Sequence, residues 1–113
     1  MPALPTSTST KPITAHIACP ESDGHRFLVP DESKSFLISC GVDYTKDTEE
    51  IGHGPAIDVE QCVEKCAKND RCTACGWGYI EGDKDDEYRC WMKGWLGGDH
   101  VARANWTFAV LEG

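Results

Sequence analysis

The alternation of apolar and polar positions predicts β-strands before and after one helix. Residues 25–29 are mostly apolar and suit a short strand, and residues 35–44 alternate with Phe36, Ile38 and Cys40 on one face. Residues 45–55 are polar and are predicted to form a loop. After the helix, strands are predicted over residues 72–80, 88–96 and 102–111, with an acidic hairpin loop at 81–87 and a turn at 97–99.

A single helix is predicted to begin after Asp58. Asp58 is a good N-cap residue, and Gln61 three positions later completes the pattern of a capping box. The apolar positions that follow repeat at the spacing of one helical face, and they are Val59, Cys62, Val63, Cys66 and Ala67. Both cysteine side chains of this helix are therefore expected to point toward the core.

This order of elements indicates an α+β fold, in which an antiparallel sheet of about five strands packs one helix on one face. Residues 17–113 are expected to form this single domain. Residues 1–16 are rich in Pro, Ser and Thr, and we expect a flexible leader or an expression remnant there. Their pattern is not that of a signal peptide.

Composition narrows the class of partner and the compartment. The net charge of −8 argues against nucleic acid or an anionic membrane as the main partner. No apolar run approaches the length of a membrane span, so no membrane insertion is expected. Seven cysteines in 113 residues favour an oxidising compartment, and we expect a secreted, extracellular protein. Asn105 opens the sequence N-W-T, which is a candidate N-glycosylation site.

The cysteine cluster at 62–75 admits three interpretations. A four-thiolate zinc site would use Cys62, Cys66, Cys72 and Cys75. However, only five residues separate its two halves, and the other cysteines would remain unexplained. A thioredoxin-like C-x-x-C would precede a helix, whereas C-T-A-C follows one. Disulfides are favoured, because two helix cysteines can reach two different strands, and neither a metal nor a cofactor is expected.

Three stretches of this sequence resemble PAN/apple domains. They are the helix C-V-E-K-C (62–66), the strand opening C-T-A-C-G-W (72–77) and the strand C-W-M-K (90–93). Three more resemble fungal secreted members of that family: C-P-E-S-D-G (19–24), F-L-I-S-C-G-V-D-Y (36–44) and N-W-T-F-A-V-L (105–111). The similarity runs from Ile17 to the C-terminus, and the cysteine framework is its specific part.

The resemblance implies a disulfide framework. It pairs Cys62 with Cys90 and Cys66 with Cys72. Apple repeats of blood proteases have a further bridge between their termini, which this chain lacks because no cysteine follows Cys90. Cys19 and Cys40 remain as candidates for a third bridge, although seven cysteines allow many pairings.

Cys75 is then the unpaired cysteine. It occupies a position that is usually aliphatic and inward in the family, with Trp77 on the same face. We interpret it as a buried core residue with a free thiol, since a free cysteine behaves as a small hydrophobe. Pairing between two chains through Cys75 is the alternative interpretation.

The sequence shows no catalytic motif, so we expect no enzymatic activity. The four histidines lie in the leader or in predicted loops and edges, and none shares a motif with Cys75. The acidic loop 81–87 lacks the spacing of a calcium loop, and a solvated hairpin tip is favoured there.

The predicted strand at residues 88–96 suggests a place for a ligand. If Cys90 faces the helix, Met92 also points inward, whereas Arg89, Trp91 and Lys93 point outward. On the neighbouring strand, Cys75, Trp77 and Tyr79 are expected inward and Ala74, Gly76 and Gly78 outward.

A hairpin register with Gly78 opposite Trp91 would lay the indole over glycine backbone between two cations. This is either a shallow aromatic platform for a sugar or peptide, or a shield that stabilises the sheet at a strand glycine. Trp95 is either a rim aromatic or a loop anchor. Trp106 alternates with Phe108 and is expected in the core.

These observations lead to one expected function and one alternative. The resemblance implies a secreted, non-catalytic module that binds carbohydrate, such as a cell-wall glycan, or protein. In fungal members it suggests an effector at a wall or host surface. The alternative is a structural module that self-associates through Cys75 or residues 94–100, and the protein is expected to be a monomer or a weak homodimer.

Overall fold

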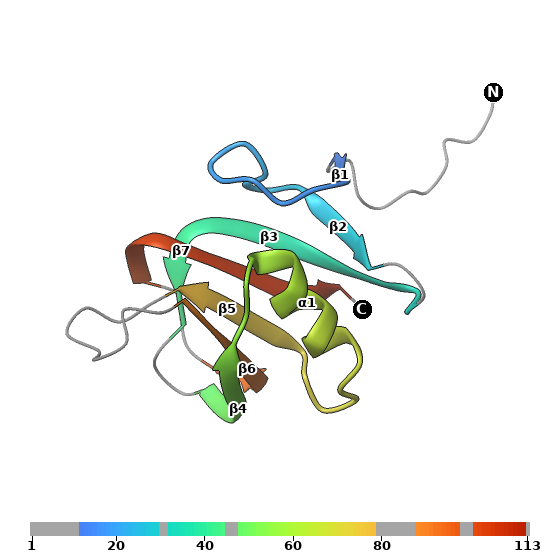
Figure 1. Ribbon diagram of the computed structural model, residues 1–113, viewed down its shortest axis with the longest axis vertical. Coiled ribbons are helices and arrows are strands. Elements are labelled where there is room, and N and C mark those ends of the chain that lie inside the picture. The colour runs from blue at the N-terminus through green and yellow to red at the C-terminus, as the bar shows by residue number, and fades with distance from the viewer. Residues whose placement is uncertain (1–11, 30–31, 45–47, 79–87, 98–100, 113) are drawn as a thin grey trace.

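The computed structural model describes residues 12–29, 32–44, 48–78, 88–97 and 101–112, which form one helix and one sheet (Figure 1). The sheet has seven strands in the order β1-β2-β3-β7-β5-β6-β4. The elements are β1 (Ile13–Thr14), β2 (Arg26–Val29), β3 (Lys34–Asp43), β4 (Thr48–Pro55), α1 (Val59–Ala67), β5 (Ala74–Gly78), β6 (Arg89–Leu96) and β7 (Val101–Glu112).

The α+β class with one helix on a sheet is confirmed, but the expected strand number and direction were wrong. Seven strands replace five, and the sheet is mixed because β1 pairs with β2 in parallel. One added strand is β1, so ordered structure reaches into the range 1–16 that we expected to be a leader. The other is β4, which lies within the predicted loop 45–55 and pairs with β6.

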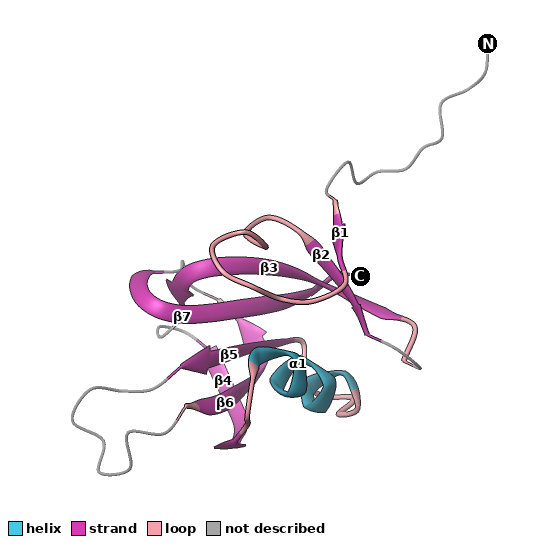
Figure 2. Cartoon of the chain, turned by 45° about the horizontal axis from the view of Figure 1, so that its top comes forward, coloured by secondary structure: helices cyan, strands magenta, loops and turns pink. Residues whose placement is uncertain are grey.

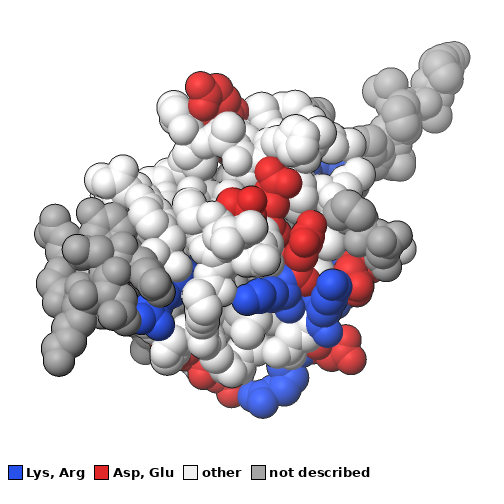
Figure 3. Space-filling model, viewed as in Figure 1, with Lys and Arg blue, Asp and Glu red and all other residues white. Residues whose placement is uncertain are grey.

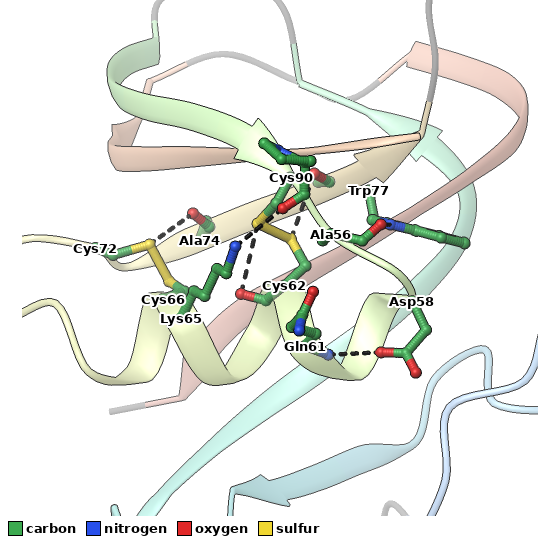
Figure 4. Close-up of a disulfide and its surroundings, with 12 residues drawn as sticks. Ala56, Asp58, Gln61, Cys62, Lys65, Cys66, Cys72, Ala74, Trp77 and Cys90 are labelled. Atoms are coloured by element: carbon green, nitrogen blue, oxygen red, sulfur yellow. Dashed lines mark hydrogen bonds between the residues drawn. A yellow bond between two sulfur atoms is a disulfide. The ribbon is translucent and has the colours of Figure 1, made fainter. Parts of the chain in front are cut away.

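The helix begins where the sequence predicts it. The Asp58 carboxylate accepts a hydrogen bond from the Gln61 backbone N–H at 2.8 Å. The Gln61 side chain accepts from the N–H of Ile57 at 2.9 Å, one residue before the N-cap. All five positions of the apolar helical face are buried. Figure 4 shows this helical turn beside the disulfide that joins the helix to the sheet.

The main core lies between α1 and one face of the sheet (Figure 2). Phe36 and Ile38 of β3 and Val63 of α1 are fully buried there. On the outer surface of this side, acidic and basic side chains are interspersed rather than separated (Figure 3). The opposite face of the sheet carries no helix among the described residues.

Three disulfides join separate elements. Cys62 of α1 bonds Cys90 of β6, and Cys66 bonds Cys72. These are the pairs that the resemblance implied. The third disulfide joins Cys19 and Cys40, the pairing that the sequence alone left open. Cys75 is free and buried. The zinc interpretation fails, because three of its four proposed ligands are committed to disulfides.

Two remaining observations concern partners and loops. No helix among the described residues is long and apolar enough to cross a membrane. Tyr79, the acidic loop 81–87 and most of the turn at 97–99 lie outside the described residues, as does residue 100.

Candidate functional site

The register between β5 and β6 differs from the predicted one by two residues. Trp91 lies opposite Gly76, and Gly78 lies opposite Arg89. A shift of two residues leaves every side chain on the same face of the sheet, because side chains along a strand alternate between the two faces. Cys75 and Met92 therefore face the helix as predicted, and Trp91 and Lys93 face away from it.

The glycines of β5 are covered by aromatic rings from β7, not by Trp91. A Cβ atom built on Gly76 would lie 2.8 Å from Cδ2 of Phe108, and one on Gly78 would lie 2.7 Å from Cγ of Trp106. Phe108 and Trp106 are both buried, as expected. Their rings lie on the sheet face away from the helix, however, and neither belongs to the helix-side core cluster.

A hollow of about 180 Å³ opens on this face, and we call it the sheet-face hollow. Its lining comes from the end of β3 and from β4, β6 and β7. The lining residues are Asp43, Tyr44, Glu50, Trp91, Lys93, Arg103 and Trp106. Clefts that enclose drug-sized ligands measure roughly 300–1,000 Å³, so this hollow suits a single ring or side chain.

The aromatic side chains around the sheet-face hollow are held by ring contacts. The Trp91 indole stacks on the His53 ring at a centroid distance of 4.6 Å. Tyr44 packs against Phe108 at 4.7 Å, and the Arg103 guanidinium lies 4.8 Å from the Trp106 ring centroid. The rings are therefore fixed before any ligand arrives, which lowers the entropy cost of binding.

Most of the charged groups in the sheet-face hollow have partners. Arg103 Nη1 donates to Asp43 Oδ2 at 2.7 Å, and the other oxygen of Asp43 accepts from the Tyr44 N–H at 2.9 Å. Glu50 Oε2 lies 2.9 Å from Nδ1 of His53. Lys93 differs, because the residue is 8 % exposed and its side chain has no ion pair or hydrogen bond with any described residue.

The structure brings together two of the five predicted ligand residues. Trp91 and Lys93 line the sheet-face hollow, whereas Arg89, Gly78 and Trp95 do not. Trp95 is 51 % exposed near the end of β6.

Sequence reasoning missed the remaining lining residues, which are Asp43, Tyr44, Glu50, Arg103 and Trp106. No local motif connects residues from separate strands. One usable signal is that Trp106 lies close to a cation in sequence, at Arg103.

The other candidate positions have simpler environments. Burial raises the pKa of the Cys75 thiol to about 12, so the thiolate needed for nucleophilic chemistry is disfavoured. Asn105 is exposed on β7, so its side chain is accessible to a glycosylating enzyme. Among the described residues, no three His, Cys, Asp or Glu side chains gather as a metal site would require.

A second, larger hollow of about 520 Å³ lies near the start of α1. It is lined by Pro55, Ala56, Ile57, Gln61, Trp77 and Tyr88. The Trp77 indole N–H is already used there, since it donates to the Ala56 carbonyl at 3.2 Å. Tyr88 directly follows residues 79–87 in sequence, and those residues lie outside the described part of the chain.

Comparison with known proteins adds no further constraint on the site. No protein-family model, curated protein or solved structure matches this chain. The interpretation of the sheet-face hollow therefore rests on its own residues and geometry.

Proposed function

We propose that this protein is a secreted, non-catalytic binding module that recognises carbohydrate in the sheet-face hollow. The observation that carries the proposal is the combination of Trp91 and Trp106 with charged side chains in a hollow sized for one ring. Small-ligand sites typically pair an aromatic surface with a few placed polar groups. A sugar ring has both kinds of surface, since its C–H face is apolar and its hydroxyl groups form hydrogen bonds.

Two further observations support secretion and the family. The three disulfides fit an oxidising compartment. The PAN/apple resemblance of the cysteine framework points to a binding module, and its fungal members suggest a cell-wall glycan as ligand. An effector that acts at a wall or host surface would use such a site without altering the ligand.

The chemistry of the cysteines supports a non-catalytic role. Six are committed to disulfides, and Cys75 is buried with a raised pKa. A buried, protonated thiol is a poor nucleophile. The charged side chains that line the hollow, such as Arg103, Asp43 and Glu50, are instead suited to holding hydroxyl groups.

The proposal is tested by titrating the protein with a panel of wall-derived oligosaccharides and following tryptophan fluorescence. We expect Trp91→Ala to weaken binding by at least about tenfold, as truncation of a central tryptophan does in binding sites. Trp95→Ala is the matched control, because Trp95 lies on the same strand but outside the lining.

Two outcomes would reject the proposal. One is that no oligosaccharide of the panel binds. The other is that Trp91→Ala, with an unchanged urea midpoint, binds as tightly as the wild type.

A self-association module is the second candidate, and one observation favours it. Ile57 is 82 % exposed beside the larger apolar hollow, and exposed apolar surface of this kind is typical of protein contacts. Cys75 is a poor route to a covalent dimer, because its thiol is buried. Gel filtration of wild type and Ile57→Ser tests this candidate, which predicts a dimer that the variant loses.

A further inference from the structure

Lys93 is an unusual residue for the inside of a hollow. Lysine is almost never buried without a charged partner, because its ammonium loses hydration when it leaves water. Lys93 as a whole residue is nevertheless 8 % exposed, and none of the described residues pairs with its ammonium. Its Nζ is not one of the fully buried unpartnered side-chain atoms, so the ammonium reaches the open space of the hollow. Its side chain lines the sheet-face hollow, so its ammonium is available to a ligand there.

The carboxylates of the same hollow are already engaged. Glu50 is the residue across the strand pair from Lys93, but its Oε2 lies 2.9 Å from the His53 ring. Asp43 is bonded to Arg103 and to the Tyr44 N–H. The hollow is therefore lined by two carboxylates, Asp43 and Glu50, and two cations, Arg103 and Lys93. The Lys93 ammonium is the one of these four groups that has no described residue within ion-pair or hydrogen-bond distance.

We propose that the sheet-face hollow selects an acidic sugar, a hexuronate whose carboxylate pairs with the Lys93 ammonium while its ring lies in the hollow beside Trp91. This inference deepens the proposed function and rests on it. The ligand supplies the ion-pair partner that the Lys93 ammonium lacks among the described residues, and a charge-assisted hydrogen bond is stronger than a neutral one.

The net charge of the molecule shapes this selectivity. With a net charge of −8, the protein repels a long polyanion at a distance. The attraction therefore acts only at contact, where one carboxylate meets one ammonium. This predicts recognition of a single hexuronate unit rather than general affinity for polyanions.

The test compares two ligands that differ in charge and in the small ester methyl groups. Trigalacturonate and its methyl ester are titrated against the wild-type protein by isothermal calorimetry, and we expect the ester to bind about tenfold more weakly or worse. A glucuronate-bearing xylo-oligosaccharide shows whether the hollow accepts the carboxylate on a second type of hexuronate. Dextran sulfate, a polyanion without hexuronate, should gain nothing from charge alone.

A pair of variants locates the effect. Lys93→Met keeps most of the aliphatic stem and removes the charge, and we expect it to bind trigalacturonate about tenfold more weakly, so that the acid loses its advantage over the ester. Lys68→Met removes the same charge from an exposed site at the end of α1 and is expected to change neither ligand.

The outcomes separate this inference from the proposed function. If acid and ester bind equally and both depend on Trp91, the protein binds carbohydrate and the inference about Lys93 is wrong. If neither ligand binds and no other sugar does, the proposed function fails. The ester comparison uses the wild-type chain, so it decides the inference even if Lys93→Met does not fold.

Discussion

The two outward glycines of β5 make the second face of the sheet possible. Gly76 and Gly78 carry no side chains, and the rings of Phe108 and Trp106 occupy the space above them. Aromatic side chains that cover strand glycines stabilise a sheet. The same arrangement fixes Trp106 as one wall of the sheet-face hollow, so packing and binding share these residues.

Gly78→Ala is expected to destabilise the protein because its Cβ has no room against the Trp106 indole. Overpacking of this kind lowers the free energy of unfolding by about 1–3 kcal/mol. Gly54→Ala is the matched control, since a Cβ at Gly54 meets nothing within 4 Å, and its effect should stay within about 0.5 kcal/mol. Urea unfolding followed by tryptophan fluorescence measures both, and equal effects would contradict the packing described above.

Cys75 is expected to resist alkylation in the folded protein. Its side chain is 1 % exposed, and burial raises the pKa of its thiol to about 12, so almost no thiolate exists at pH 8. Iodoacetamide without reductant should label no cysteine in the native protein and one, Cys75, in urea. Peptide mass mapping identifies the labelled residue. Rapid labelling of the native protein would show that the thiol is accessible.

The raised pKa also fixes the direction of a pH effect. Above the ordinary cysteine pKa, the unfolded chain loses a proton that the folded chain keeps until about pH 12. Ionisation of Cys75 in the unfolded chain therefore lowers the free energy of unfolding progressively as the pH rises from about 9 to 12, and it has no effect on this free energy at pH 7.

At the scale of elements, the helix with its strong local sequence pattern was predictable, whereas the edge strand β4 was not. The helix has an N-cap and a five-residue apolar face, so its position follows from Asp58 onward. The strand β4 has none of these signals, because it combines glycines, a proline and adjacent acidic residues. Bulges at Glu49 and Glu50 interrupt its alternation further, as is common for edge strands.

The register of β5 and β6 shows a second limit of local patterns. Side-chain faces follow from alternation, so the orientations of Cys75, Trp91 and Lys93 could be predicted. A shift by two residues leaves these faces unchanged, so alternation cannot select between Gly76 and Gly78 as the partner of Trp91. That choice depends on pairing with β7 as well.

The sheet-face hollow was predictable only in part for the same reason. Trp91 and Lys93 belong to one strand, and their shared face follows from its alternation. Glu50 comes from a strand that the pattern did not reveal, and Asp43 and Arg103 meet through pairing of β3 with β7. Contacts between distant strands require the topology, which no local pattern encodes.

At the scale of the molecule, 113 residues form a small core that covalent bonds reinforce. Two disulfides tie α1 to the region of β5 and β6, and the third ties the segment before β2 to β3. The helix therefore holds one face of the sheet rigid, and the other face remains available for the sheet-face hollow.

The two helix disulfides are expected to differ in their contribution to stability. The four cysteines Cys62, Cys90, Cys66 and Cys72 are all buried, so replacing either pair by alanine removes similar packing. The loops differ, because Cys62–Cys90 spans a sequence separation of 28 and Cys66–Cys72 one of 6. A cross-link that closes a longer loop removes more conformational entropy from the unfolded chain. The expected contribution to the free energy of unfolding is about 3–4 kcal/mol for Cys62–Cys90 and about 2 kcal/mol for Cys66–Cys72. Urea unfolding of the two double variants measures the difference, and a larger loss in Cys66→Ala/Cys72→Ala would mean that native packing around the bond, not the unfolded chain, sets its contribution.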